Sequence, residues 1–226
     1  MKILALDTST EYCSVALWID AQVDSRDERA GQRHSELLLG TIDELLKHAA
    51  LRLRELDGIA YGEGPGSFTG LRIACGVVQG LAFGSGLPVV GIGTLLAMAA
   101  GTDAENVVCC VDARMNEVYH AAYSLHEGGW RAVHDPRVCA PDAVPDVPGD
   151  PWLACGSGFA VYRETLTSRY AGKLMTIDTE RYPRARDIAA LAVPYFESGR
   201  VASAEHAVPV YIREKVALRI DERPNR

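Results

Sequence analysis

The sequence predicts a duplicated α/β fold, and two observations support it. An apolar strand at residues 3–7 ends in Asp7 and is followed by turn residues and a second strand at 13–19. The same order recurs at residues 108–112, which end in Asp112. The two acids lie 105 positions apart (112 − 7), close to half of the 226 residues. Strand–turn–strand units at that spacing indicate a repeated domain.

The remaining elements follow in α/β order. In the first half, periodicity and turn residues predict a helix at 35–50, a strand at 58–62, a helix at 68–84, a strand at 89–92 and a helix at 94–101. The second half has a strand at 117–123, an irregular proline-rich connection at 136–151, a strand at 152–155, helices at 163–170 and 185–198, an extended tail at 209–213 and frayed residues at 221–226. We therefore expect two subdomains, 1–104 and 105–226.

Composition places the chain among globular proteins. Hydrophobic residues make up 48% and charged residues 23%, and the net charge of −7 argues against a broad basic surface for nucleic acid. The six cysteines show no C-x-x-C spacing, so free thiols in the cytoplasm are expected. Residues 73–100 carry no charge and could be a membrane span. The turn signal at 84–88 favours a helix and a strand instead, with no membrane contact.

The segment 64–73, GPGSFTGLRI, joins a strand to a helix. Gly64 and Gly66 allow unusual backbone angles, and Ser67 or Thr69 can cap the helix. Such a loop presents free N–H groups that suit a phosphate or carboxylate, although a plain tight turn is the alternative. With the acid-ended strands it outlines a candidate vestigial site for a phosphate or nucleotide: Asp7, Thr8, Ser9, Gly64, Gly66, Ser67 and Asp112. Asp112 beside Arg114 is alternatively a salt-bridged turn.

The helix at 68–84 carries a stripe of glycines at 76, 80 and 84. Each costs roughly 1 kcal/mol relative to alanine, so close packing by another helix should offset it. The stripe faces either the chain's own sheet and the helix at 35–50, or another subunit. The two interpretations are equally supported by the spacing.

Catalytic motifs are missing from the sequence. His34 precedes Ser35 and Glu36, but adjacent residues do not face each other on a helix, so His34 is expected to be a helix-entry residue and Ser35 an N-cap. The other histidines lack metal-ligand spacing, and no H-E-x-x-H, G-x-S-x-G or Walker A motif is present. The turn after Asp7 lacks the glycine that actin-like ATPases and sugar kinases use to admit a phosphate. We expect no metal and no cofactor.

Five segments carry a resemblance to a known family: residues 3–9, 34–38, 64–73, 112–119 and 209–213. In this order they resemble the TsaB (YeaZ) family of bacterial tRNA threonylcarbamoyladenosine biosynthesis proteins. The resemblance spans nearly the whole chain, and its G-P-G-S-F-T-G block is specific. It implies an actin/Hsp70-like (ASKHA) fold of two ribonuclease-H-like subdomains.

The resemblance also implies a role without catalysis. TsaB is similar to TsaD, the subunit that transfers a threonylcarbamoyl group to N6 of adenosine 37 in tRNAs reading ANN codons. TsaD-type chains carry a metal-binding H-x-x-x-H, and the corresponding positions here are Thr94 and Met98. Neither side chain can replace imidazole as a ligand. The older label of the family as a glycoprotease therefore has no support in these residues.

A partner is the further implication of the resemblance. TsaB pairs with TsaD through helices that correspond to 35–50 and 68–84, a TsaE-type ATPase docks on the assembly, and tRNA binds only through the complex. A homodimer of the chain alone remains open. The expected partner interface consists of His34, Leu38, Ile42, Leu45, Gly76, Gly80, Phe83 and Gly84. The alternative is an ASKHA-type nucleotide-binding ATPase or kinase that uses Asp7, the 64–70 loop and Asp112.

Overall fold

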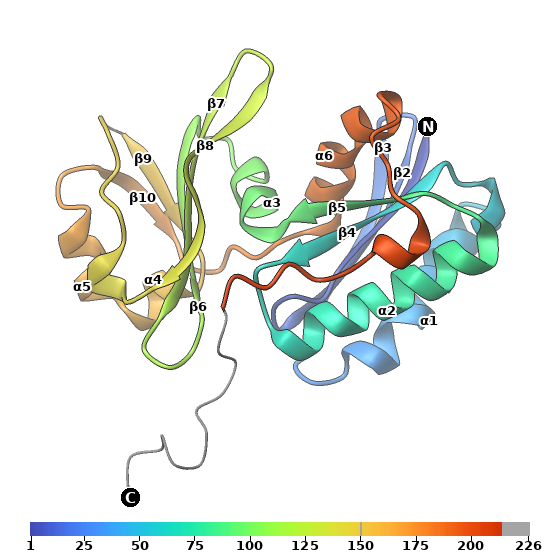
Figure 1. The fold of residues 1–226 in the computed structure, drawn as a ribbon, viewed down its shortest axis with the longest axis horizontal. Coiled ribbons are helices and arrows are strands. Elements are labelled where there is room, and N and C mark those ends of the chain that lie inside the picture. The colour runs from blue at the N-terminus through green and yellow to red at the C-terminus, as the bar shows by residue number, and fades with distance from the viewer. Residues whose placement is uncertain (150, 214–226) are drawn as a thin grey trace, which may run out of the picture.

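The computed structural model describes residues 1–149 and 151–213 and contains two lobes, each built on a five-stranded sheet (Figure 1). The first sheet has the order β3-β2-β1-β4-β5 and the second the order β8-β7-β6-β9-β10. The strands of the first sheet are β1 (Lys2–Asp7), β2 (Tyr12–Ile19), β3 (Gln22–Arg29), β4 (Gly58–Gly64) and β5 (Val89–Gly93). Those of the second are β6 (Asn106–Asp112), β7 (Val118–His126), β8 (Gly129–Cys139), β9 (Trp152–Cys155) and β10 (Leu174–Asp178).

The two sheets have the same topology. In the first, β1 runs antiparallel to β2 and parallel to β4, which is parallel to β5. In the second, β6 runs antiparallel to β7 and parallel to β9, which is parallel to β10. Asp7 and Asp112 end the equivalent central strands. The predicted duplication is thereby confirmed.

Helices cover both faces of each sheet. Apolar residues of α1 (His34–His48) and α2 (Phe68–Ser85) pack on the outer face of the first sheet. Those of α4 (Gly158–Val161) and α5 (Arg163–Arg169) cover the outer face of the second. Between the sheets lie α3 (Thr94–Ala100) and α6 (Ala185–Glu197). Three short 3-10 helices complete the fold: η1 (Leu53–Glu55), η2 (Pro141–Ala143) and η3 (Ala204–His206).

The two inner helices pack differently: α3 lies between both sheets, whereas α6 packs on the first sheet although it follows the second in the chain. Leu95, Met98 and Ala99 of α3 cluster with strands of the second sheet. Ile188 and Ala189 of α6 cluster with β1 and β5 of the first sheet. The strands of the first sheet precede residue 104 and those of the second follow it, in line with the expected division into 1–104 and 105–226. Beyond the second sheet, α6 packs on the inner face of the first, and Ala204 and Ala207 join the core beneath α1 and α2.

The predicted elements differ from the structure mainly at the sheet edges. The edge strand β3 was not predicted, because its sequence, QVDSRDER, lacks the alternation of apolar and polar residues that marks a strand. The edge strand β8 extends to Cys139, so the irregular connection begins after that residue rather than at Pro136. Residues 209–213 are extended without forming a strand, as predicted. The predicted frayed end at 221–226 lies outside the described residues.

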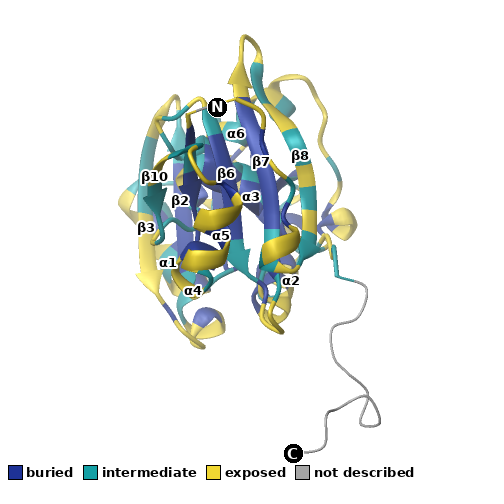
Figure 2. Cartoon of the chain, turned by 90° about the vertical axis from the view of Figure 1, so that its left-hand side faces the viewer, coloured by how far each residue is buried: buried dark blue, intermediate teal, exposed yellow. Residues whose placement is uncertain are grey.

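Burial follows the layers, with the central strands dark and the outer surfaces of α4 and α5 exposed (Figure 2). The uncharged stretch 73–100 forms most of α2, then β5 and α3, as the turn signal predicted. In the part of the chain that is described, every helix falls short of the length and hydropathy of a membrane span. Ser35 does not cap α1, whose N-cap position is Arg33 and has no side-chain cap bond.

Candidate functional site

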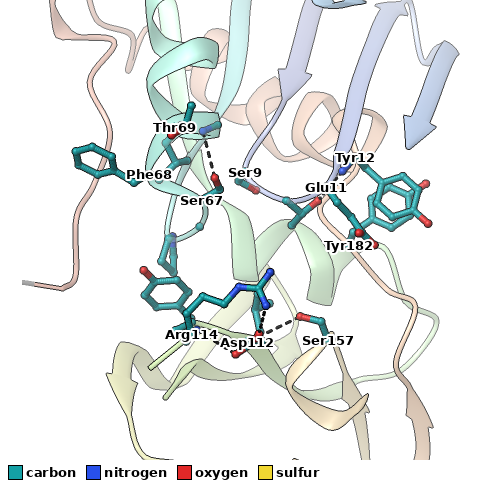
Figure 3. A pocket seen from close by; sticks show the side chains of 18 of the residues that line it. Ser9, Glu11, Tyr12, Ser67, Phe68, Thr69, Asp112, Arg114, Ser157 and Tyr182 are labelled. Carbon is teal, nitrogen blue, oxygen red and sulfur yellow. Dashed lines mark hydrogen bonds and ion pairs between the residues drawn. The ribbon is translucent and has the colours of Figure 1, made fainter. Parts of the chain in front are cut away.

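A cleft of about 1170 Å³ lies between the lobes. The first lobe contributes the β1–β2 turn and the start of α2 (Figure 3). The second contributes the turn after β6, Ser157 and residues 179–182. Residues 210–213 also line it. Of the candidate phosphate residues, Ser9, Gly66, Ser67 and Asp112 line the cleft, whereas Asp7, Thr8 and Gly64 do not.

The glycine-rich loop lies directly against the β1–β2 turn. The Ser67 N–H donates to the Ser9 carbonyl at 2.7 Å, and the Thr8 hydroxyl donates to the Gly70 carbonyl at 2.7 Å. Ser67 is the N-cap of α2, since its hydroxyl accepts from the Gly70 N–H at 3.3 Å. One free donor of the first turn, the Gly70 N–H, is thus already paired within the chain.

The glycines of this loop permit that contact. A Cβ atom on Gly66 would lie 2.6 Å from the Ser9 carbonyl oxygen, and one on Gly70 would lie 1.9 Å from the Thr8 carbonyl oxygen. Backbone packs on backbone here, which leaves no room for a phosphate between the loop and the turn. The tight-turn interpretation accounts for Gly66 and Gly70 without a ligand.

Asp7 is buried behind this contact, with 1% of its surface exposed. Its Oδ1 accepts from the Ser9 N–H at 2.9 Å and from the Ser9 hydroxyl at 2.8 Å, while its Oδ2 is buried without a hydrogen-bond partner. Desolvation by burial raises the pKa of Asp7 from 3.8 to about 7, against the two bonds from Ser9 that lower it. At neutral pH this carboxyl is only partly ionised, and it does not line the cleft, so it is poorly placed to hold Mg²⁺.

Asp112, the equivalent acid of the second lobe, is part of a salt-bridged turn. Its carboxylate pairs with the Arg114 guanidinium at 3.2 Å and accepts from the Arg114 N–H at 3.0 Å (Figure 3). The Tyr162 hydroxyl also donates to it at 3.4 Å. The Asp112 N–H donates to the Ser157 hydroxyl at 3.1 Å. These partners occupy the acid that an ATPase would use.

Thr94 and Met98, the positions aligned with a histidine pair, are both buried in α3. The Thr94 hydroxyl donates to the Pro65 carbonyl at 2.5 Å, and Met98 packs in the core of the second lobe. Within residues 1–149 and 151–213, no group of three or more His, Cys, Asp or Glu side chains is arranged to hold a metal ion.

The second candidate surface is the outer face of α1 and α2, and four of its expected residues are wrong. Leu38, Ile42 and Leu45 are at most 3% exposed, because they pack in the core under α1. His34 is also buried, with its Nε2 at 2.9 Å from the Thr10 carbonyl oxygen. Helical periodicity identified an apolar stripe, but that stripe faces the chain's own sheet.

The glycine stripe has the opposite orientation. Gly76, Gly80 and Gly84 are exposed, and a Cβ atom on any of them would meet nothing within 4 Å. Phe83 beside them is 85% exposed, and Leu39 on α1 is 52% exposed. Packing on the chain's own sheet is therefore not what the glycines serve. A smooth, partly apolar face remains open along α2.

An aromatic pair that the sequence did not reveal closes one rim of the cleft. Tyr12 of the first lobe stacks on Tyr182 of the second, with ring centroids 3.7 Å apart and planes 2° from parallel (Figure 3). The two residues are 170 positions apart (182 − 12), and no local pattern joins them.

The comparisons with known proteins agree with this architecture. Residues 24–219 match the family model of TsaD, tRNA N6-adenosine threonylcarbamoyltransferase. The tRNA threonylcarbamoyladenosine biosynthesis protein TsaB of Escherichia coli is 37% identical, with 96% of each chain covered. The protein of that name from Haemophilus influenzae is 38% identical over 96% of this chain and 95% of its own. The chain belongs to the TsaB (YeaZ) family.

Solved structures of similar proteins have the same fold as this chain. YeaZ from Pseudomonas aeruginosa is 39% identical and superposes with a TM-score of 0.85 over 93% of this chain and 99% of its own. An activator of 2-hydroxyisocaproyl-CoA dehydratase from Clostridium difficile, solved with bound ADPNP, is 9% identical with a TM-score of 0.50 over 88% of this chain and 97% of its own. That likeness concerns the fold alone and confirms the ASKHA class.

Two glycines of α2 should respond oppositely to alanine. Gly70→Ala places a methyl group against the Thr8 backbone and should lower the free energy of unfolding by roughly 1–3 kcal/mol. Gly76→Ala is the matched control in open space and should raise it by up to about 1 kcal/mol. Denaturant unfolding measures both. A Gly70→Ala protein as stable as the parent would contradict the close contact.

Asp7 should make stability depend on pH. The unfolded carboxyl releases its proton near 3.8 and the folded one near 7, so the contribution of Asp7 to stability is fully present below pH 3.8 and is lost as the pH rises toward 7. The full loss is on the order of 4 kcal/mol. Asp7→Asn should remove this slope and be more stable than the parent above pH 7, in denaturant titrations between pH 5 and 8. If the free energy of unfolding of Asp7→Asn and of the parent changed in parallel with pH, the prediction would be refuted. The control is Asp142→Asn, at an exposed position, which should keep the slope of the parent.

Proposed function

We propose that this chain is a non-catalytic subunit in the biosynthesis of N6-threonylcarbamoyladenosine, which it supports by pairing with a TsaD-type catalytic subunit. The names of its relatives support the pathway. The product would be the modified adenosine 37 of tRNAs reading ANN codons. A TsaE-type ATPase would bind the assembly.

The open glycine face of α2 carries this proposal. Three glycines in the middle of a helix destabilise it, and nothing within the described chain packs on them to offset the cost. A partner helix can approach such a face closely because no side chain holds the backbones apart. Phe83, 85% exposed, supplies an aromatic anchor at its end. The interface thus consists of Gly76, Gly80, Phe83, Gly84 and the exposed residues of α1, including Leu39.

The cleft supports a role without chemistry. Asp7 is buried and only partly ionised at neutral pH, and Asp112 is paired with Arg114. The contact between the 64–70 loop and the β1–β2 turn occupies the place of a phosphate. These features count against the alternative of an ASKHA-type ATPase or kinase. With a net charge of −7, tRNA binding would depend on the partner.

Reconstitution with each subunit left out tests the function. The complete set of this chain, a TsaD-type subunit, a TsaE-type ATPase and the enzyme that makes threonylcarbamoyl adenylate should modify a tRNA that reads an ANN codon. Omitting this chain should abolish modification, whereas this chain alone should neither hydrolyse ATP nor transfer the group. Full modification in its absence, or turnover by it alone, would refute the proposal.

Gly80→Leu tests the surface. The side chain enters open space in the monomer, so the melting temperature should stay within a few degrees of the parent. Against a partner helix it should separate the backbones and weaken pairing with a TsaD-type subunit by about tenfold or more.

The control for added apolar surface is Thr165→Leu on the exposed face of α5, in the other lobe. It should leave pairing unchanged in the same binding titration. Unchanged pairing by Gly80→Leu would move the interface away from the glycine face.

A further inference from the structure

Residues 207–213, here called the strap, leave η3 along the first lobe and cross toward the second (Figure 1, red). The Gln79 amide donates to the Ala207 carbonyl at 3.0 Å, and the Val210 N–H donates to the Glu63 carbonyl at 2.7 Å. A Cβ atom on Gly64 would lie 2.7 Å from the Val210 carbonyl oxygen, so Gly64, with φ +120°, admits the strap. Backbone contacts thus fix its first half to β4 and α2.

Tyr211 continues the attachment at the first turn of α2. Its hydroxyl accepts from the Arg72 Nε at 2.9 Å, and its ring lies 5.4 Å from that of Phe68. The Arg72 guanidinium lies 3.8 Å from the centre of the Phe68 ring. The three side chains form one cation–π cluster on the first lobe.

Arg213 reaches the second lobe. Its guanidinium pairs with Glu117, lies 3.5 Å from the Arg114 carbonyl oxygen and 3.7 Å from the Met115 sulfur, and 5.9 Å from the centre of the Tyr119 ring. Only 14% of this side chain is exposed, which distinguishes the pair from an ordinary surface ion pair. The end of the strap is therefore held by an ion pair and by further hydrogen bonds from the guanidinium N–H groups.

The segment that Arg213 contacts is a strained turn. Arg114, Met115 and Asn116 have φ values of 61°, 57° and 59°, and non-glycine residues rarely adopt this region three times in succession. Such a conformation persists where surrounding contacts hold it. Arg213 supplies such contacts from the strap, which is attached to the first lobe.

We infer that the strap is a latch that fastens the two lobes across the cleft, with the Arg213–Glu117 pair as its closure. The Tyr12–Tyr182 stack fastens another part of the cleft rim, so opening requires release of the latch or sliding of the stack. The latch ties the first turn of α2 to the turn after β6 and holds the cleft at one width. This inference does not rest on the proposed pairing.

The test is the distance between the lobes, measured by pulsed electron paramagnetic resonance on the full chain. Nitroxides on Glu44→Cys in α1 and Thr165→Cys in α5 report on the two lobes, both positions being exposed. Cys139→Ser removes the one cysteine among the described residues that is not buried. The parent should give one narrow distribution. Arg213→Ala should raise the population of longer distances roughly tenfold.

Glu117→Gln breaks the same pair from the other lobe and should broaden the distribution in the same way. The exchange Arg213→Glu with Glu117→Arg should narrow it again relative to Arg213→Glu alone. Arg163→Ala, exposed on α5 and without a salt bridge in the described chain, should leave it unchanged. An unaltered distribution in folded Arg213→Ala and Glu117→Gln, or no recovery on exchange of the charges, would overturn the latch.

Discussion

The backbone contact between the 64–70 loop and the β1–β2 turn sets the direction of α2. Ser67 and Gly70 bond to Ser9 and Thr8, and the missing side chains of Gly66 and Gly70 bring the segments together. This contact leaves no space between the loop and the turn, and Asp7 is buried behind it. It also anchors the helix whose far end carries the open glycine face. One close backbone contact at the start of α2 thus fixes the position of the exposed glycine face farther along the same helix.

Much of this architecture could be predicted from the sequence. The repeat of an apolar strand ending in an acid is a local pattern, and the sheets reproduce it at Asp7 and Asp112. Edge strands were harder to predict from the sequence. The edge strand β3, for example, is almost entirely polar and mostly exposed or half-buried, so it has no apolar pattern. The return of α6 to the first lobe depends on which apolar face remains uncovered, a property of the whole fold that no window of sequence contains.

The candidate surfaces show the same limit. Periodicity correctly indicated that Leu38, Ile42 and Leu45 share one face of a helix, but it does not say whether a sheet or a partner covers that face. For Gly80 the sequence could not show whether any segment of the chain packs on it. A glycine in open space and a glycine beneath another helix can occur in the same local sequence. Tyr12 with Tyr182, and Arg213 with Glu117, are contacts between residues far apart in the chain. Tertiary structure alone reveals such pairs.

The return of α6 to the first lobe has a consequence for synthesis on the ribosome. The inner face of the first sheet is completed by Ile188 and its neighbours, which emerge almost 100 residues after β5 ends (188 − 93 = 95). Throughout that interval the nascent first half presents uncovered alanine, valine and isoleucine side chains to its surroundings, a state open to misassociation. The first lobe therefore cannot reach its final form as an autonomous N-terminal unit. Its maturation waits for nearly the whole polypeptide.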